Sequence, residues 1–287
     1  MILDMFLIAI ALIALIIASV TDFKKREIPD FLSYSLLSIA IFSKILQSII
    51  EKALIHLIYA AIGFSIFFII ALIMYHAKQW GGGDSKMLMS LGIIFSEYPK
   101  EFLNYLNPNL NIPILLSLFI NILLIGSVYG VLFSSYLAIK NKERFIKEFK
   151  NANKKNLKYY LIISLITLIF SFLISNLTLK LLILALSLWV LLIPYLLLFT
   201  RTVEKSCMIK NIQVSKLTEG DWITENIYSK NKIIYSSKSL GITKRQIQDI
   251  KRLNIKEVTI KEGIPFVPSF LIAFITTLIY GNVIFFI

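Results

Sequence analysis

Two aspartates are the residues of this sequence best suited to perform chemistry together. Asp22 ends a long apolar run and precedes a basic turn, and Asp84 follows three consecutive glycines, 62 residues further on. Two carboxylates that meet in one site can share a proton. The ionised one can then take a proton from water while the protonated one polarises a peptide carbonyl. If the fold brings Asp22 and Asp84 together, the expected chemistry is that of an aspartic protease.

The glycines before Asp84 have a physical use in such a site. Gly81, Gly82 and Gly83 let the backbone turn sharply and approach a ligand closely. Free backbone N–H groups there could hydrogen-bond an extended peptide or a developing oxyanion. Irregular backbone at membrane depth is tolerated only where it is buried in protein or lines a wet cavity. A helix that starts near Asp84 is therefore expected to begin part-way into a membrane.

Simpler interpretations stay open for each of these residues. Asp22 could cap the next segment or end a helix at the interface. The glycine run could be a flexible loop or a phosphate-contacting loop, although the strand context and the Lys-Ser/Thr pair of a P-loop are missing. Asp30 follows Pro29 and is expected to be a helix N-cap. His56 and His76 lie on separate turns, and we expect packed or interfacial residues rather than ligands.

Composition limits the class of protein. The chain has 287 residues, of which 57% are hydrophobic and 16% charged, whereas an ordinary soluble domain is roughly 25% charged. These values exclude a disordered chain and a water-soluble globule, and they indicate an integral membrane protein. Because Cys207 is the single cysteine, no internal disulfide or cysteine-based metal cluster can form. We expect no metal and no other cofactor.

Apolar runs indicate an all-α polytopic protein. A transmembrane helix needs about 20 apolar residues, and most of the long runs qualify. These runs are Met5–Val20, Phe31–Ile50, Ala53–Tyr75, Ile112–Ile139, Tyr159–Ser175, Leu179–Thr200 and Phe266–Ile287. An eighth run, Met87–Phe95, becomes a span only if its helix starts near Asp84 and continues towards Tyr98. About eight transmembrane helices are therefore expected.

The positions of the basic residues predict the orientation. The formal net charge is +13, which could indicate an anionic partner or a positive-inside bias. With the N-terminus outside and eight spans, 26 of the 30 Lys and Arg residues fall inside. The four outside are Lys44, Lys52, Lys100 and Lys180. This asymmetry predicts a plasma-membrane protein with both aspartates at the cytoplasmic face, and a nucleic-acid partner is not needed.

Five segments are expected along the chain. Residues 1–140 form a membrane core with both aspartates, 141–158 a basic cytosolic loop, and 159–200 a transmembrane hairpin. Residues 203–263 form a small cytosolic module, and 264–287 the last transmembrane helix. The basic loop is expected to be a helix at the anionic inner leaflet or a solvated loop that only sets topology. Asn121, in an apolar run, is expected to hydrogen-bond another helix.

The module is expected to have an α+β fold. Alternation over Asn211–Leu217 and Trp222–Tyr228 predicts a hairpin or a strand–turn–strand unit. A capping box at Thr243 and Gln246 predicts the start of a helix, and Glu257–Ile260 predicts a further strand. Docking or guidance of a substrate and a passive insertion are both open roles for this module.

Two segments together resemble the type IV prepilin peptidase family, most closely its archaeal branch, which includes the preflagellin peptidases. The Ser-Val-Thr-Asp-Phe-Lys-Lys-Arg-Glu-Ile-Pro-Asp stretch around Asp22 is similar to the family's first catalytic segment. The stretch Gly81–Met87 is similar to its Gly-x-Gly-Asp motif and the following lysine. The resemblance covers about residues 1–140, and residues 263–266 resemble the entry into the last helix of archaeal members. It implies that Asp22 and Asp84 are the catalytic pair.

The resemblance also implies the substrate and the supporting residues. Gly81, Gly82, Gly83 and Lys86 would support substrate or backbone near the site. The substrates would be type IV prepilin-like or preflagellin precursors, cut at the cytoplasmic membrane face to release a short basic leader. Glu27, Asp30 or acids of the module would offset repulsion between that leader and a basic protein surface. Paired Cys-x-x-Cys motifs of some bacterial members are missing, so their second, N-methylating activity is not carried over.

Alternatives of two classes remain. The hairpin and the module exceed the six-helix core of minimal archaeal members, which favours prepilin processing over a strictly preflagellin role. A membrane protease of the signal-peptide-peptidase type is disfavoured because its Tyr-Asp pair is missing around Asp22. The different class is a receptor or transporter with a cytosolic sensor domain. A transporter would be expected to place ionisable groups near mid-membrane and to show repeated halves.

Overall fold

The computed structural model describes residues 2–152, 157–229 and 232–284. Residues 153–156 of the expected basic loop and 285–287 of the expected last span lie outside the described residues. The chain divides into two compact units, one of Met1–Gly130 with Ile212–Ile287 and the other of Val131–Asn211.

Helices dominate the described residues. The α-helices are α1 (Ile2–Lys25), α2 (Asp30–Ile50), α3 (Ile55–His76), α4 (Gly82–Ile94), α5 (Ile114–Lys140), α6 (Lys142–Asn151), α7 (Leu157–Phe172), α8 (Leu177–Val203), α9 (Lys244–Arg252) and α10 (Val267–Tyr280). The strands are β1 (Ile209–Gln213), β2 (Trp222–Ile223), β3 (Ile227–Ser229), β4 (Lys232–Tyr235) and β5 (Glu257–Lys261). Short 3₁₀ turns cover Lys100–Asn104 and Val214–Lys216, and a π turn covers Glu204–Met208.

The lengths of these helices confirm a multi-pass membrane protein. In the described part of the chain, α1, α2, α3, α5 and α8 are long and apolar enough to cross a membrane, whereas α7 and α10 are shorter. Helix α4 has 13 residues, which gives about 20 Å at 1.5 Å per residue. The hydrocarbon core is about 30 Å thick, so α4 does not cross it alone. The expected number of about eight spans is therefore not confirmed.

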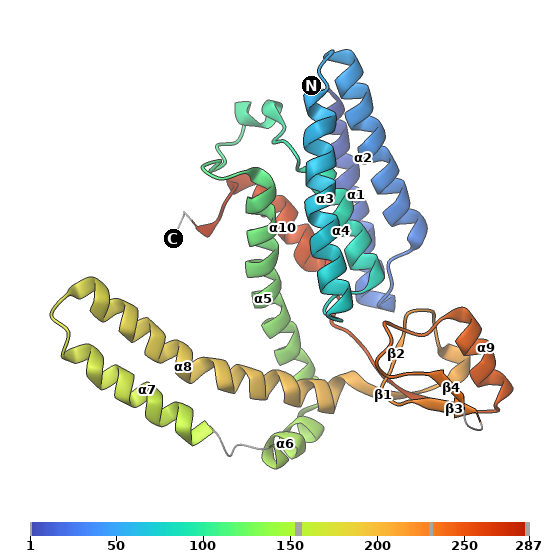
Figure 1. Cartoon of the computed structure of the whole chain (residues 1–287), viewed down its shortest axis with the longest axis vertical. Helices are drawn as coiled ribbons and strands as arrows, with labels where there is room; N and C mark the ends of the chain where they lie inside the picture. The colour runs from blue at the N-terminus through green and yellow to red at the C-terminus, as the bar shows by residue number, and fades with distance from the viewer. Residues whose placement is uncertain (1, 153–156, 230–231, 285–287) are drawn as a thin grey trace. The chain divides into compact units, whose positions relative to one another are not determined.

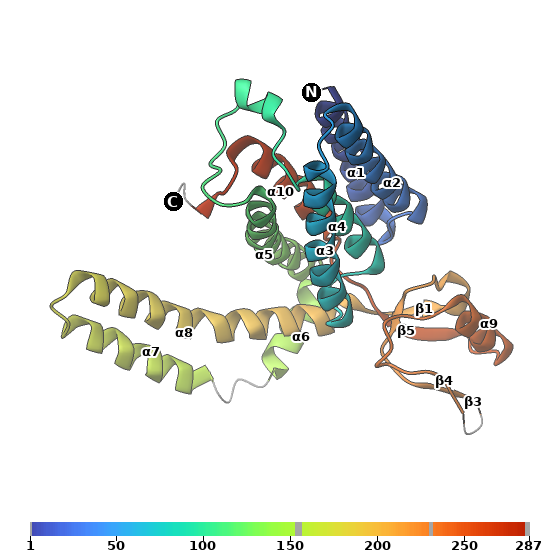
Figure 2. The same ribbon diagram turned by 45° about the horizontal axis from the view of Figure 1, so that its top comes forward.

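The hydrophobic core of the first unit forms around α4. Helices α1, α2 and α3 run side by side (Figures 1 and 2), α4 packs against α2 and α3, and α10 packs against α1. One cluster of buried apolar side chains draws on α1 to α5 and α10. Leu88 and Leu91 of α4 are completely buried in it, together with Phe270 and Phe274 of α10. The short helix is thus enclosed by longer ones.

Two glycines permit the close contact between α3 and α4. A Cβ atom added to Gly63 of α3 would collide with the carbonyl oxygen of Gly92 in α4. Small residues at helix crossings let backbones approach closely, which is a recurrent means of helix association in membranes. This crossing fixes the position of α4, and with it the residues of its first turn.

A buried polar network ties four parts of the first unit together at the end of α2. Lys44 is only 2% exposed, and its Nζ lies 3.5 Å from Asp4 of α1, 3.0 Å from Gln47 and 3.7 Å from Glu97. His56 at the start of α3 is bonded through Nδ1 to Glu97 at 2.7 Å. Buried charges are tolerated when they are paired in this way. His56 is therefore a packed, hydrogen-bonded residue, as expected.

The expected hydrogen bond from Asn121 between helices is confirmed. Asn121 of α5 is buried, and its Nδ2 donates to the Thr277 hydroxyl and to the Gly281 carbonyl at 2.8 Å each. Both acceptors lie at the C-terminal end of α10, whose last carbonyls lack partners within the helix. Asn121 thus holds α5 against the end of α10.

The module expected over residues 203–263 has the predicted α+β composition but a different strand order. Strand β5 lies between β1 and β2, and β2 pairs antiparallel with β5 through Trp222 opposite Lys261. Of the two predicted arrangements, the hairpin is therefore wrong, because β1 and β2 do not pair with each other. The capping box is confirmed, since Thr243 N donates to Gln246 Oε1 at 2.9 Å and Gln246 N to Thr243 Oγ1 at 3.3 Å. Figure 2 shows α9, which this box starts, beside the strands.

The second unit contains α6, α7 and α8. Helices α7 and α8 lie side by side (Figures 1 and 2), and the Ser164 hydroxyl of α7 donates to the Ser187 carbonyl of α8 at 2.8 Å. Phe145 of α6 packs edge-on against Phe199 of α8. Part of the expected basic loop is thus the amphipathic helix α6. The division of the chain into five domains stays a prediction.

We expect Asn121→Ala to lower the free energy of unfolding by about 1–3 kcal/mol, because it leaves the carbonyl of Gly281 without its buried donor. Ser127→Ala is the matched control, since Ser127 is exposed on the same helix and bonds only within it. Thermal unfolding of the two purified variants in detergent measures the difference. Equal midpoints for both variants would contradict this role of Asn121.

Candidate active site

The last turn of α1 carries Asp22 into the protein interior. Its side chain is only 6% exposed. One carboxylate oxygen, Oδ2, accepts a hydrogen bond from the backbone N–H of Val267 at 3.1 Å. Val267 is the first residue of α10, where backbone N–H groups have no acceptor within the helix. The charged guanidinium of Arg26 also acts on Asp22 electrostatically. The start of the last helix therefore orients this carboxylate.

The first turn of α4 carries Asp84. Its Oδ2 accepts a hydrogen bond from the backbone N–H of Gly81 at 2.8 Å. Gly81 is the N-cap residue of α4, and a carboxylate at the N-terminal turn is favoured by the partial positive charge of the helix end. Asp22 lies close enough to act electrostatically on Asp84. Each aspartate thus has one oxygen held by a backbone N–H group.

Three aromatic rings pack behind the two backbone donors. Trp80 directly precedes Gly81, and Phe266 directly precedes Val267; their ring centroids are 5.6 Å apart. Phe270 contacts both rings, at 5.3 Å from Trp80 and 5.5 Å from Phe266. The rings bury a large apolar area in a defined geometry. This aromatic trio therefore fixes the start of α4 and the start of α10 relative to each other.

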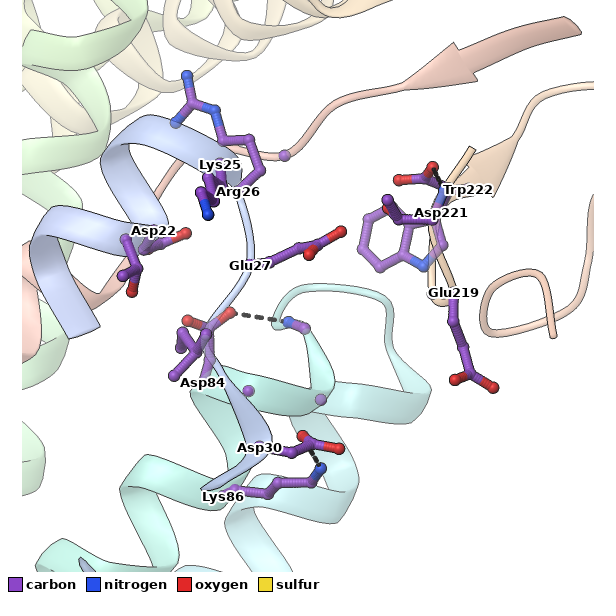
Figure 3. Close-up of a pocket in the computed structure, with 18 of the residues that line it drawn as sticks. Asp22, Lys25, Arg26, Glu27, Asp30, Asp84, Lys86, Glu219, Asp221 and Trp222 are labelled. Carbon is purple, nitrogen blue, oxygen red and sulfur yellow. Dashed lines mark hydrogen bonds and ion pairs between the residues drawn. The ribbon is translucent and has the colours of Figure 1, made fainter. Parts of the chain in front are cut away.

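Asp22 and Asp84 line the same cavity, which has a volume of about 690 Å³. The glycines before Asp84 and the loop between α1 and α2 line it as well. The module contributes residues 218–222 and 261–263 to the same lining. Figure 3 shows the two aspartates at this cavity together with Glu27 and Lys86.

Lys86 lines the cavity and pairs with an acid from α2. Its Nζ lies 2.6 Å from Asp30 Oδ1 and 4.7 Å from the centre of the Tyr34 ring. The expectation that Asp30 is an N-cap is wrong, because Pro29 occupies the cap position and the Asp30 carboxylate makes this ion pair instead. Lys86 therefore joins the start of α4 to the start of α2.

The glycines of the site differ in their surroundings. A Cβ atom added to Gly83 would lie 2.8 Å from Cβ of Ile28, in the loop between α1 and α2. At Gly82 the nearest atom, in the Tyr75 ring, would be 4.0 Å away. Close approach is thus required at Gly83 and not at Gly82. It brings the loop that follows Asp22 against the turn that carries Asp84.

The sequence pointed to Asp22, Asp84, the three glycines and Lys86, and all six line this cavity. It did not point to the N–H groups of Gly81 and Val267 as donors to the carboxylates, nor to Trp80 and Phe266. Every residue except proline has a backbone N–H group, so residue type does not indicate which of them donates to a carboxylate. Aromatic residues are common in apolar runs, so their presence does not indicate a role at the site. The Gly-Ile-Pro-Phe entry into the last helix was the one signal near Val267.

Comparison with known proteins identifies the region that holds the cavity's two aspartates. The model of the type IV leader peptidase family matches residues 9–134. This range includes both Asp22 and Asp84, begins within α1 and ends within α5. Residues 9–134 are therefore similar to the type IV leader peptidase family.

Three curated relatives carry the same name, preflagellin peptidase. The protein of Methanocaldococcus jannaschii is 27% identical over 135 residues, which cover 47% of this chain and 57% of the relative. The Methanococcus maripaludis protein is 36% identical over 103 residues, covering 36% and 44%. The Methanococcus voltae protein is 28% identical over 158 residues, covering 54% and 63%. The chain thus spans about half the length of these relatives. No solved structure matches the chain significantly.

We expect Gly83→Ala to destabilise the protein by about 1–3 kcal/mol, the usual cost of overpacking, because the new methyl group displaces Ile28. Gly82→Ala, one residue earlier in the same helical turn, should leave stability nearly unchanged. The thermal midpoints of the two variants in detergent give the comparison. A midpoint for Gly83→Ala at or above that of Gly82→Ala would show that the loop does not need this approach.

Proposed function

We propose that this protein is a membrane-embedded aspartic endopeptidase that cleaves the leader from type IV prepilin-like precursors. One observation carries the proposal: Asp22 and Asp84, each in a segment resembling a motif of the leader peptidases, line a single cavity. The match of residues 9–134 to the type IV leader peptidase family supports it. Preflagellin precursors are the alternative substrate, which the names of the three relatives favour. The family match does not favour a receptor or transporter.

The proposed mechanism uses the two carboxylates in opposite protonation states. The ionised aspartate takes a proton from a water molecule as the water oxygen attacks the carbonyl carbon of the scissile bond. The protonated aspartate gives its proton to the carbonyl oxygen, so a neutral tetrahedral diol forms. On collapse, the C–N bond breaks and the leaving nitrogen receives the proton taken from water. The diol returns a hydroxyl proton to the other aspartate, which restores the pair.

The hydrogen bonds around the carboxylates fit this mechanism. Backbone N–H groups of Val267 and Gly81 hold one oxygen of Asp22 and of Asp84. Donors fixed in this way cost little reorganisation during the reaction. Two like carboxylates near one another do not both ionise easily, so the pair titrates as a unit.

Cleavage at the cytoplasmic membrane face is part of the proposal. The basic residues predict that the end of the bundle with Asp22 and Asp84 faces the cytoplasm. A precursor with a hydrophobic helix in the bilayer would present its leader at that boundary. The same orientation puts the 203–263 module in the cytoplasm.

We expect Asp22→Asn and Asp84→Asn each to lower the cleavage rate by at least about 10²–10⁴-fold, the usual contribution of a general acid or base. Both variants should still insert into the membrane. Asp249→Asn is the matched control, since Asp249 lies on α9 away from the cavity lining. The assay follows release of the leader by mass spectrometry, from a prepilin precursor and separately from a preflagellin precursor. Wild-type processing by either aspartate variant would contradict the proposal.

A further inference from the structure

The module forms one wall of the cavity that contains the two aspartates. Residues 218–222, which lead from the turn after β1 into β2, and residues 261–263, at the end of β5, line the cavity. The loop from α1 to α2 lines it next to Asp22. A peptide bound at Asp22 and Asp84 would therefore lie beside this loop and the module.

Hydrogen bonds hold the turn of the module in one conformation. The Asp221 carboxylate accepts from Thr218 N at 2.8 Å, and the Asp221 carbonyl accepts from Ile242 N at 2.9 Å. The indole N–H of Trp222 donates to the Leu240 carbonyl at 3.1 Å. A wall that is already ordered costs little entropy when it binds a ligand. The turn is thus preorganised for binding a ligand.

The charge of the cavity lining is opposite to the charge of the chain. Seven acidic and four basic side chains line it, although the chain carries +13. The end of α1 and the loop after it contribute Glu27 together with Lys25 and Arg26. The module contributes Glu219, Asp221 and Glu262 together with Lys261, and Glu219 lies 3.4 Å from Lys244. Figure 3 shows Glu27 extended from the loop towards Asp221 and Trp222. The acids therefore come from both the loop and the module.

The nearby acidic side chains affect the pKa of Asp221. Burial raises the pKa of its carboxyl, the hydrogen bond from Thr218 lowers it, and the nearby Glu27 and Glu262 raise it further. A cation between these carboxylates would relieve their repulsion and favour the ionised form of Asp221. The wall is thus electrostatically suited to a positively charged ligand.

We propose that Glu27, Glu219, Asp221 and Glu262 form a subsite that binds Lys and Arg side chains of the peptide substrate, on the leader side of the bond that is cut. The proposal rests on the proposed peptidase function and assigns the module a role in substrate selection. Carboxylates bind a guanidinium or ammonium by charge-assisted hydrogen bonds. The subsite selects a cationic leader before the bond reaches Asp22 and Asp84.

The test combines altered enzymes with altered substrates. The triple variant Glu27→Gln, Glu219→Gln, Glu262→Gln is compared with wild type on a prepilin precursor and on the same precursor with its leader Lys and Arg replaced by Gln. We expect KM for the basic precursor to rise about tenfold, given roughly threefold or less for each partly exposed charge, with kcat nearly unchanged. KM for the neutral precursor should stay the same. The control variant Glu225→Gln, Glu257→Gln changes exposed acids of the module outside the cavity lining.

A charge-reversal variant tests whether Glu262 contacts the basic side chains of the leader directly. Glu262→Lys should weaken binding of the basic precursor and improve binding of a precursor whose leader carries Glu in place of Lys. A merely structural role of Glu262 would weaken both.

The outcomes separate the subsite from the peptidase activity. If the triple variant processes both precursors as wild type does, or loses activity on both equally, the subsite is overturned while the catalytic proposal stands. If the wild-type protein cleaves neither precursor, the proposed function fails, and the subsite fails with it. A selective rise in KM for the basic precursor supports both.

The subsite also predicts a pH dependence. Asp221 faces Glu27, Glu262 and Lys261 in the cavity, and its raised pKa means that it becomes protonated at a higher pH than an ordinary aspartate. As pH falls through that pKa, the ratio of KM for the basic precursor to KM for the neutral one should rise. Asp221→Asn keeps an oxygen acceptor for Thr218 and should remove this dependence. An unchanged pH profile in Asp221→Asn would contradict binding by Asp221.

Discussion

The hydrogen bond from the backbone of Val267 to the buried carboxylate of Asp22 is the constraint on which the site depends. A carboxylate removed from water needs such a donor, and this donor lies 245 residues along the chain from its acceptor. The core around α4 is therefore complete only when the last helix has packed against the first. The second unit and the module lie between these two helices in the sequence, and α10 follows the module directly along the chain.

The membrane helices could be predicted because their signal is local. Apolar runs matched α1, α2, α3, α5 and α8 to within a few residues, since lipid demands both length and hydrophobicity. The capping box of Thr243 was predictable for the same reason. The strand order of the module was not, because alternation of side chains identifies a strand without naming its partner. Strand β5, more than thirty residues later, occupies the place expected for β1 beside β2.

The two aspartates of the candidate site could be predicted from the sequence, whereas the residues that hold them in place could not. Residue type, the glycine run and the positive-inside bias together indicated that Asp22 and Asp84 would lie at one end of the bundle, and they line one cavity. Their catalytic roles stay a proposal. Asp30 was wrongly predicted to be a helix N-cap. Pro29 occupies that position, and the Asp30 carboxylate pairs with Lys86, which is far away in sequence. Trp80 and Phe266 owe their position to tertiary packing, which single-residue patterns do not encode.

The paired lysine at the far end of α2 has a consequence for how the protein is made. A lysine within a membrane helix costs a few kcal/mol to place in lipid alone, and Lys44 is compensated by Asp4 and Glu97. Glu97 is synthesised 53 residues after Lys44, beyond the end of α4. Helix α2 therefore cannot reach its final state as an independent insertion event. The first four helices and the segment with Glu97 therefore have to be present together before Lys44 reaches its final pairing.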